Sequence, residues 1–300
     1  MKNILITGSN GLLGQKLIKL LVKKNAYNIY GVSKGENRLK NKKGYTYIDL
    51  DITDKNSLSK LIEKINPSFI IHTAAMTNVD TCELHKKECD IINVDAVRNL
   101  VESCKKKDIH LIHISTDFIF DGKNGFYKEV DNPNPINYYG LSKLKSEKSI
   151  IESKIKHTIL RTILVYGLTD DKKNNIVSWI KKSIENKQQI NVVTDQLRMP
   201  TLVDDLAHAC ILALENNVIG VFNVSSNQLM SIYEIAIEVS KAFDLDKSFI
   251  NPIATTSLDQ PAKRPPITGF DLTKSINELK LPSYSFIERL QVFKNQLERV

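Results

Sequence analysis

The sequence predicts an α/β fold with a doubly wound parallel sheet and a smaller C-terminal lobe. An apolar strand runs into a glycine-rich turn and an amphipathic helix at the start of the chain. Strand-like and helical stretches then alternate, a pattern typical of parallel sheets with right-handed crossovers. After Gly167 the pattern loosens. We therefore predict one domain over residues 1–165 and a second over residues 166–300, with a strand and a helix near residues 195–245 that could rejoin the first.

The first turn has the glycine spacing of a Rossmann-type, dinucleotide-binding loop. Residues 4–6 form the apolar strand, and Gly8, Gly11 and Gly14 follow at intervals of three. In such a loop the first glycine permits a tight turn, the second lets the backbone approach a pyrophosphate, and the third lets the helix pack closely on the sheet. The start of that helix offers free N–H groups to the phosphates. An ordinary strand-to-helix turn is the alternative.

Hydrophobic periodicity places the other elements of the first half. The expected strands are residues 28–33, 45–48, 69–73, 109–115 and 157–165. The expected helices are residues 57–65, 89–107 and 138–153. We expect the strand at residues 69–73 to be buried on both faces, as in a parallel sheet.

The second half is less regular. The expected elements are helices at residues 176–185, 203–215 and 231–243 and a strand at residues 220–224. Ser231 and Glu234 have the spacing of a capping box, which fixes the start of the third helix. Residues 251–270 hold four prolines and little periodicity, so we expect them to be mostly loop. The second lobe should leave a cleft at the carboxyl ends of the strands.

Composition excludes several classes of protein. With 42% hydrophobic and 25% charged residues the chain has the balance of a globular protein, and no apolar run approaches the roughly 20 residues that span a bilayer. The amino terminus enters a strand directly, without a signal-peptide segment, so we expect a cytoplasmic protein with no membrane partner. The four cysteines form no C-x-x-C pair, so we expect reduced thiols and no metal site.

The net charge of +8 comes from lysines scattered in pairs and triplets. Nucleic-acid binding would need a contiguous basic stripe with interleaved aromatic residues, which the sequence lacks. We therefore expect a solvated lysine-rich surface and no nucleic-acid partner. A basic balance also suits an anionic ligand such as a nucleotide diphosphate.

Tyr139 and Lys143 are the strongest candidates for acid–base chemistry. They lie four residues apart in an expected helix and so share one face. A phenol has an ordinary pKa of about 10, and a nearby ammonium favours the phenolate and lowers that pKa. The pair could then act as a general acid or base. Tyr138 is a weaker candidate because its neighbour one turn further on is Ser142, which carries no charge.

Two expected strands end in residues suited to a ligand. Ser115 and Thr116 offer hydroxyls to a substrate oxygen, or to the backbone at the strand end. Ala74 and Ala75 leave another strand and are small enough for a flat ring to approach the backbone. Open α/β sheets bind their ligands at the carboxyl ends of the strands, where both pairs lie. His72 is expected to be packed rather than catalytic.

The end of the second strand indicates the cofactor. An NAD enzyme places an acidic residue there, about 20 residues after the glycines, to bind the ribose 2′-hydroxyl. Here the chain reads Val32-Ser33-Lys34-Gly35, and the first carboxylate is Glu36. Ser33, Lys34 and Arg38 could instead meet a 2′-phosphate. We therefore favour NADPH, with NADH as the alternative.

Together these motifs resemble the extended short-chain dehydrogenase/reductase superfamily, and more closely the dTDP-4-dehydrorhamnose reductase family. The closer resemblance is carried by Ala74-Ala75-Met76-Thr77-Asn78-Val79-Asp80, Ser115-Thr116-Asp117-Phe118-Ile119-Phe120-Asp121-Gly122, Leu160-Arg161-Thr162, Tyr166-Gly167, Asp195-Gln196-Leu197-Arg198-Met199-Pro200-Thr201 and Arg264-Pro265. The resemblance covers nearly the whole chain. It implies reduction of the 4-keto group of a nucleotide-linked 6-deoxyhexose, most simply dTDP-4-dehydrorhamnose to dTDP-L-rhamnose, with a nicotinamide cofactor.

The resemblance also implies roles for single residues. Tyr139 would protonate the forming C4 alkoxide, Lys143 would tune Tyr139 and hold the nicotinamide ribose, and Thr116 would hydrogen-bond the substrate oxygen. The implied cofactor-binding residues are Gly8, Asn10, Gly11, Leu12, Leu13, Gly14, Ser33, Lys34, Arg38, Asp51, Ile52, Ala74, Ala75, Thr77, Tyr139 and Lys143. The implied substrate-binding residues are Val79, Ser115, Thr116, Asp117, Phe118, Arg198 and Arg264. The implied partner is a nucleotide-sugar substrate, and a homodimer is a possible assembly.

Some substrate-side positions depart from the family pattern. The family usually has Tyr at Phe118, Trp near Leu164, Gly at Arg198 and Trp at Tyr233. None of these departures touches the Tyr139–Lys143 pair, so we expect reductase chemistry and leave the sugar open. The alternatives are a nucleotide-sugar epimerase, a reductase of another deoxysugar, and a non-catalytic cofactor-binding regulatory subunit like the β subunit of methionine adenosyltransferase.

Overall fold

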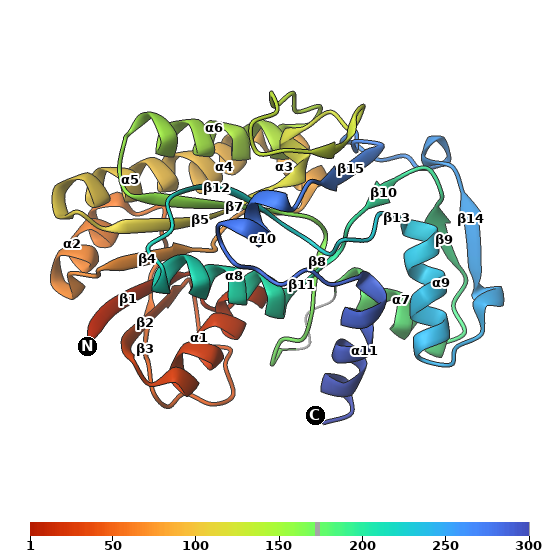
Figure 1. Ribbon diagram of the computed structural model, residues 1–300, viewed down its shortest axis with the longest axis horizontal. Coiled ribbons are helices and arrows are strands. Elements are labelled where there is room, and N and C mark those ends of the chain that lie inside the picture. The colour runs from red at the N-terminus through yellow and green to blue at the C-terminus, as the bar shows by residue number, and fades with distance from the viewer. Residues whose placement is uncertain (172–174, 300) are drawn as a thin grey trace.

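The computed structural model describes residues 1–171 and 175–299 and contains a seven-stranded, all-parallel sheet. In spatial order its strands are β12 (Gly220–Val224), β7 (His157–Thr162), β5 (His110–Thr116), β4 (Phe69–His72), β1 (Lys2–Thr7), β2 (Tyr27–Ser33) and β3 (Thr46–Asp49). The chain therefore builds outward from β1 in both directions, as a doubly wound sheet does (Figure 1). The predicted fold class is confirmed.

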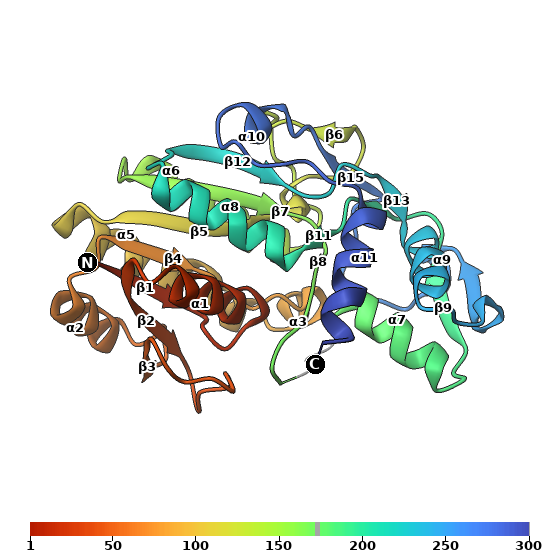
Figure 2. The same ribbon diagram turned by 60° about the horizontal axis from the view of Figure 1, so that its bottom comes forward.

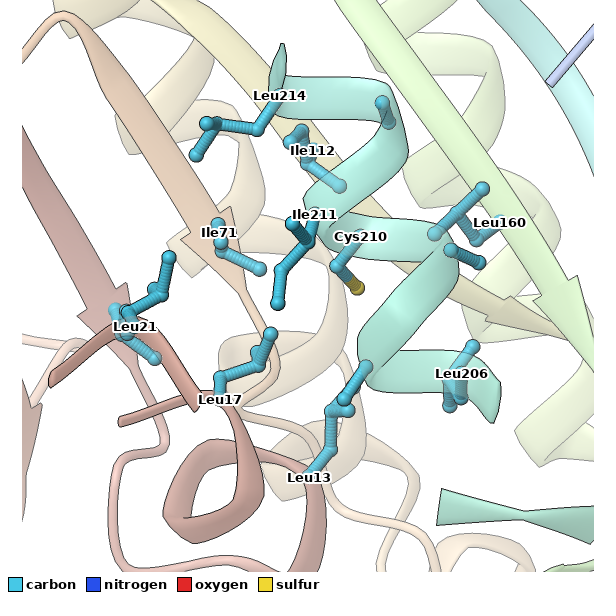
Figure 3. Packing of buried hydrophobic residues seen from close by; sticks show 14 of the residues in the cluster. Leu13, Leu17, Leu21, Ile71, Ile112, Leu160, Leu206, Cys210, Ile211 and Leu214 are labelled. Atoms are coloured by element: carbon cyan, nitrogen blue, oxygen red, sulfur yellow. The ribbon is translucent and has the colours of Figure 1, made fainter. Parts of the chain in front are cut away.

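Two helices, α1 (Leu12–Lys24) and α8 (Val203–Glu215), cover one face of this sheet. Because side chains alternate along a strand, Ile4 and Ile6 of β1 point to this face while Leu5 points to the other. Figure 3 shows leucines of α1 interleaved with side chains of α8 above the central strands. This apolar layer holds α1 close to the sheet, which fixes the glycine turn that precedes it.

The opposite face is covered by α2 (Lys55–Ile65), α5 (Ala96–Lys107) and α6 (Tyr138–Glu152). Two short helices, α3 (Val79–Leu84) and α4 (Lys86–Asp90), follow β4, and a π-helical turn (Ile91–Asp95) joins α4 to α5. The helix expected at residues 89–107 is therefore one helical run with a π turn inside it. Figure 1 shows α5 and α6 above the sheet, with α1 and α8 below it.

A smaller lobe lies beyond the carboxyl ends of the strands (Figure 2). Its helices are α7 (Ile176–Glu185), α9 (Ile232–Ala242) and α11 (Phe286–Leu297), beside the paired strands β9 (Ile190–Val193) and β14 (Ile250–Ile253). A four-stranded sheet stands between the lobe and the large sheet. Its strands, in spatial order, are β13 (Met230–Ser231), β10 (Leu197–Arg198), β15 (Ile267–Phe270) and β6 (Gly125–Tyr127).

The chain between residues 195 and 245 is divided between the two parts. Helix α8 and strand β12 belong to the large sheet and its cover, whereas α9 packs in the core of the lobe. Later, α10 (Thr273–Asn277) packs on β12 before the chain returns to the lobe with α11. The domain boundary at residues 165 and 166 stays a prediction.

Two sequence expectations need correction. The strand expected at residues 157–165 ends at Thr162, and Val165–Tyr166 form a separate strand, β8, paired with β11 (Thr201–Leu202). Leu164 interrupts the strand because its backbone is left-handed, with φ of 41°. Most of residues 251–270 lie outside strands as expected, but the loop is shorter than the whole segment, because β14 extends to Ile253 and β15 begins at Ile267.

The capping box at the start of α9 is confirmed. The Ser231 hydroxyl accepts from the Glu234 N–H at 3.0 Å, and the Glu234 carboxylate accepts from the Ser231 N–H at 2.7 Å. Among the helices within the described ranges, none combines the length and apolar character that a bilayer crossing requires.

Candidate active site

The glycine turn between β1 and α1 is too crowded for side chains. Gly8 has φ of +71°, and a Cβ on it would lie 2.6 Å from the Ala74 backbone nitrogen. A Cβ on Gly14 would lie 2.3 Å from the Gly8 carbonyl oxygen, so α1 starts directly against the turn. Gly11 precedes α1 and lines the groove described next. The bare backbone at the start of a helix fits the diphosphate of a dinucleotide.

A groove of about 480 Å³ runs from this turn across the carboxyl ends of β1, β2 and β4. It brings together eight predicted cofactor-binding residues: Gly8, Gly11, Ser33, Lys34, Asp51, Ile52, Ala74 and Ala75. The other lining residues are Leu50, Thr53, Thr73 and residues of the α4-to-α5 run. Its shape and lining fit an extended nucleotide cofactor.

The other predicted cofactor residues surround the groove without lining it. Leu12 and Leu13 begin α1, and their side chains pack in or against the apolar core. Asn10 instead braces the loop after β2, because its amide donates to the Glu36 carbonyl at 2.8 Å and its oxygen accepts from the Arg38 N–H at 2.9 Å. Thr77 is exposed before α3.

The two cations after β2 are paired with carboxylates. Lys34 Nζ lies 3.1 Å from Asp51 Oδ2, and Arg38 Nη1 lies 3.3 Å from Asp171 Oδ2. Hydrogen bonds from Thr53, with a smaller contribution from Lys34, hold the pKa of Asp51 below its usual range. Both cations are at least half exposed, so a bound anion can draw them from these weak surface pairs.

Tyr139 lies at the start of α6, against the end of β5. Its hydroxyl hydrogen-bonds Thr116, and its ring meets the Phe118 ring edge-on at 6.1 Å between centroids. Burial raises the pKa of Tyr139 above its usual value, with a further increase from the Asp117 carboxylate and a partial decrease from the Thr116 hydrogen bond. The expected net lowering of this pKa is therefore not found in the protein alone, because burial dominates. At neutral pH the phenol keeps its proton.

Tyr138, the competing tyrosine, faces a different neighbourhood. Its hydroxyl bonds Asp90 Oδ2 at 2.8 Å, and its ring lies beside the ammonium groups of Lys86 and Lys145. These contacts tie α6 to α4 and leave Tyr139 as the tyrosine beside the strand end.

Lys143 is buried one helical turn after Tyr139. Its ammonium donates to His113 Nε2 at 3.1 Å. Burial lowers the pKa of Lys143 to about 8, although the charges of Glu147 and Cys89 oppose this shift. His72 is packed as expected: it hydrogen-bonds Thr7 at 2.6 Å, and burial lowers its pKa to about 3.

The predicted substrate residues at the end of β5 form a buried polar cluster. The Thr116 hydroxyl donates to Asp117 Oδ1 at 3.0 Å, and Asp117 Oδ2 accepts from Thr268 of β15. Burial raises the pKa of Asp117, while the Arg198 guanidinium opposes that shift. The Ser115 hydroxyl is buried without a hydrogen-bond partner in the described ranges. These contacts place the four-stranded sheet directly on the end of β5.

Arg198 joins several segments of this cluster through hydrogen bonds. Its Nη atoms donate to the Leu197 and Pro265 carbonyls, both at 2.7 Å, and its Nε lies 4.0 Å from Asp117 Oδ2. Its guanidinium carbon lies 5.4 Å from the Phe118 ring centroid. Because these donors already have acceptors, substrate binding by Arg198 requires that some of them be released, and it stays a prediction.

The last two predicted substrate residues meet at the start of α3. Val79 opens α3, and Asp80 follows it. Arg264 holds the Asp80 carboxylate through Nη1 at 2.7 Å and Nη2 at 2.5 Å, and this pair keeps the pKa of Asp80 below its usual range. The pair ties the segment before β15 to the large domain, over the same end of the sheet.

Sequence reasoning missed two polar residues of this site. Asn93 lies in the π-helical turn, where its amide oxygen accepts from the Met76 N–H at 2.8 Å and its nitrogen donates to the Ser142 hydroxyl at 3.0 Å. His113 contacts Lys143. A signal for His113 was available, because it lies two residues before Ser115 and so shares a strand face with it. No local sequence pattern indicates the π-helical turn that directs the Asn93 side chain toward Met76 and Ser142.

The chain is similar to known proteins over almost its whole length. The family model described as "RmlD substrate binding domain" matches residues 1–299. A dTDP-4-dehydrorhamnose reductase of Aggregatibacter actinomycetemcomitans is 32% identical over 91% of this chain and 92% of its own. Methionine adenosyltransferase 2 subunit beta of Bos taurus is 32% identical over 91% of this chain and 81% of its own. The crystal structure of a Bacillus anthracis dTDP-4-dehydrorhamnose reductase in complex with NADP superposes with a TM-score of 0.87 at 29% identity, over 98% of this chain and 99% of that one.

Proposed function

The chain belongs to the RmlD substrate binding domain family of dTDP-4-dehydrorhamnose reductases, and from this premise we propose that it reduces the 4-keto group of a nucleotide-linked 6-deoxyhexose with NADPH. The simplest substrate is dTDP-4-dehydrorhamnose, which becomes dTDP-L-rhamnose. The observation that carries the proposal is Tyr139, a protonated phenol bonded to the Thr116 hydroxyl, with the Lys143 ammonium one turn along the same helix.

In the proposed reaction the sugar carbonyl oxygen accepts hydrogen bonds from Tyr139 and from Thr116, whose hydroxyl turns to it from Asp117 Oδ1. When bound, the reduced nicotinamide supplies the hydride that makes the carbonyl carbon a secondary alcohol carbon. Tyr139 gives its proton to the oxygen as negative charge develops there, so the product leaves as a neutral hydroxyl. At neutral pH the phenol holds its proton and can give it to the oxygen as the charge appears. Lys143 then stabilises the phenolate left on Tyr139.

Residues along the groove would hold the cofactor. The backbone at Gly8 and Gly11 would hold the diphosphate, and Lys143 would hold the nicotinamide ribose. Ser33, Lys34 and Arg38 would hold the 2′-phosphate, which favours NADPH over NADH because no carboxylate directly ends β2. The NADP complex of the Bacillus anthracis relative supports the same choice.

A cofactor-binding regulatory subunit is the second candidate function. It is favoured by the equal identity, 32%, to the Bos taurus beta subunit. In that role Tyr139 would transfer no proton, and the chain would act by association with a larger enzyme. Turnover by the isolated chain distinguishes the two.

Loss of NADPH absorbance with freshly made dTDP-4-dehydrorhamnose tests the proposal, beside NADH and a GDP- or UDP-linked ketosugar. We expect Tyr139→Phe to lower kcat by about 10²–10⁴-fold, the range of a lost general acid, with NADPH affinity largely retained. Tyr138→Phe is the matched control and should retain turnover, because its hydroxyl bonds only Asp90 and Lys145 in the described ranges. Full activity in Tyr139→Phe would exclude the mechanism. Binding of NADPH without turnover of any ketosugar would favour the regulatory subunit.

A further inference from the structure

The Lys143 ammonium depends on one side chain for its position. Lys143 is 3% exposed, and within residues 1–171 and 175–299 its Nζ has a single hydrogen-bond partner, His113 Nε2. Glu147 lies one turn further along α6, but both its oxygens accept from Arg161, at 3.1 and 2.8 Å. An ammonium has three N–H donors and no acceptor, so an acceptor inside the protein has a large influence on where it rests.

His113 is itself held firmly by the sheet. It pairs in register with His72 of β4, which pairs with Thr7 of β1, so the three side chains form a row on the face that α6 covers. The rings of His72 and His113 stack at 5.4 Å between centroids with an angle of 17° between their planes. Thr7 then fixes His72 through a hydrogen bond of 2.6 Å. A rigid strand therefore presents Nε2 to Lys143.

The protonation state of His113 suits an acceptor. Burial, with the charge of Lys143, holds the pKa of His113 well below its usual value, so the ring is neutral at pH 7. Because Lys143 donates to Nε2, the ring proton must lie on Nδ1. Nδ1 has no hydrogen-bond partner in the described part of the chain, so the Lys143 contact determines the tautomer.

We propose that His113 is a positioning residue, whose Nε2 lone pair holds the Lys143 ammonium in its charged form one turn from Tyr139. The inference rests on the proposed function, because Lys143 serves catalysis only where Tyr139 transfers a proton. The other titratable groups facing Lys143 are His72 on β4, Glu147 and Tyr139 on α6, and Cys89 on α4. Glu147 and Cys89 also favour the charged ammonium, but neither offers it a hydrogen bond.

The sign of the effect follows from the acceptor. A hydrogen bond to the charged form stabilises that form and raises the pKa of Lys143. Without Nε2, this pKa falls below its present value of about 8, toward neutrality. Activity that needs the ammonium is then lost at a lower pH than in the unaltered protein. Replacement of a residue that only fills space would not shift the alkaline limb, the fall in activity as the pH rises.

Three variants separate the effect of losing the hydrogen-bond acceptor at position 113 from the effect of changing the shape of its side chain. His113→Phe keeps a flat ring and removes the acceptor, whereas His113→Gln keeps an acceptor oxygen without a ring. His110→Phe is the matched control: His110 lies on the same strand, is 4% exposed, and bonds Thr158 at 2.8 Å. We measure NADPH affinity and kcat/KM against pH for each variant, and histidine ¹⁵N chemical shifts in the protein without ligands.

We expect the alkaline limb of His113→Phe to move down by about one pH unit, which corresponds to about a tenfold loss of kcat/KM on that limb. The alkaline limb of His113→Gln should lie close to that of the unaltered enzyme, and the alkaline limb of His110→Phe should be unchanged. In the ¹⁵N spectrum His113 should be the Nδ1–H tautomer with a hydrogen-bonded Nε2, and Lys143→Met should shift that signal while the His110 signal stays.

Two results would overturn the proposal: an unchanged limb in His113→Phe, or a His113→Gln variant with the same loss and the same profile as His113→Phe. An unchanged His113 ¹⁵N chemical shift in Lys143→Met would also overturn the proposal. If the unaltered protein binds NADPH but reduces no ketosugar, the proposed function fails on its own. The pH dependence of NADPH affinity in His113→Phe and His113→Gln then still decides whether His113 positions Lys143.

Discussion

His110 illustrates how burial of a single residue couples folding to pH. It is 4% exposed at the start of β5, and burial lowers its pKa to about 4. The unfolded chain binds a proton at about pH 6.5, so it holds more protons than the folded chain between these two values. The stability that the neutral ring contributes is therefore complete above pH 6.5 and declines as the pH falls toward 4.

We expect the free energy of unfolding to fall between pH 6.5 and 4.5, and His110→Phe to reduce this dependence. One proton of difference corresponds to about 1.4 kcal/mol per pH unit. Urea denaturation at several pH values checks the slope in both proteins, and the difference between the slopes isolates His110 from the carboxylates. Equal slopes would mean that His110 is already neutral in the unfolded chain or charged in the folded one.

At the residue scale the sequence singled out Tyr139, Lys143 and Thr116 and missed His113. Tyr139 and Lys143 were found because a spacing of four is local to a helix. The partner of each lies elsewhere in the chain, on β5: Thr116 for Tyr139 and His113 for Lys143. Such a pairing depends on which strand lies under α6, and spacing along the sequence does not carry that information.

At the scale of elements, two glycines in the first turn have different roles. A Cβ on Gly14 would meet the Gly8 carbonyl oxygen at 2.3 Å and the Ser9 Cα at 2.7 Å. Both are backbone atoms and cannot turn aside. A Cβ on Gly11, which lines the groove, would meet only the Gly8 carbonyl oxygen, at 3.1 Å.

We therefore expect Gly14→Ala to cost about 1–3 kcal/mol of stability, as overpacking does, because α1 must move off the turn. Gly11→Ala should lose less stability and still weaken NADPH binding, since Gly11 lines the groove in which we propose that the cofactor binds. Urea denaturation and NADPH titration of both variants separate the two effects. A Gly14→Ala protein as stable as the original would contradict the close approach of α1.

Long elements were predictable and short ones were not. The helices at residues 176–185 and 203–215 have the predicted bounds, since ten or more residues show a clear period. The two-residue strands β8, β10, β11 and β13 show no period at all. They form because neighbouring segments already hold them in place, as where Leu164 turns the chain after β7. The four-stranded sheet beside the active site therefore could not be read from the sequence.

At the scale of the whole molecule, the chain passes repeatedly between the large sheet and the lobe. It leaves β7 for α7, returns with α8 and β12, enters the lobe again with α9, and returns with α10 before ending in α11. Leu279 and Leu281 pack in the same core as α1 and α8. Asp80–Arg264 and Asp117–Arg198 link the parts again at the site. Neither part is one continuous segment.

We therefore expect a single cooperative unfolding transition. Trp179, the only tryptophan, lies on α7 and reports on the lobe, whereas far-ultraviolet circular dichroism reports on all helices. In urea the two signals should share one midpoint, because α8 and β12 cannot leave α1 and β7 while the lobe stays folded. For the same reason residues 166–300 expressed alone should not fold. A Trp179 transition at clearly lower urea than the circular dichroism transition would show instead that the lobe unfolds independently, and the Asp80–Arg264 and Asp117–Arg198 links would then be too weak to couple it to the sheet.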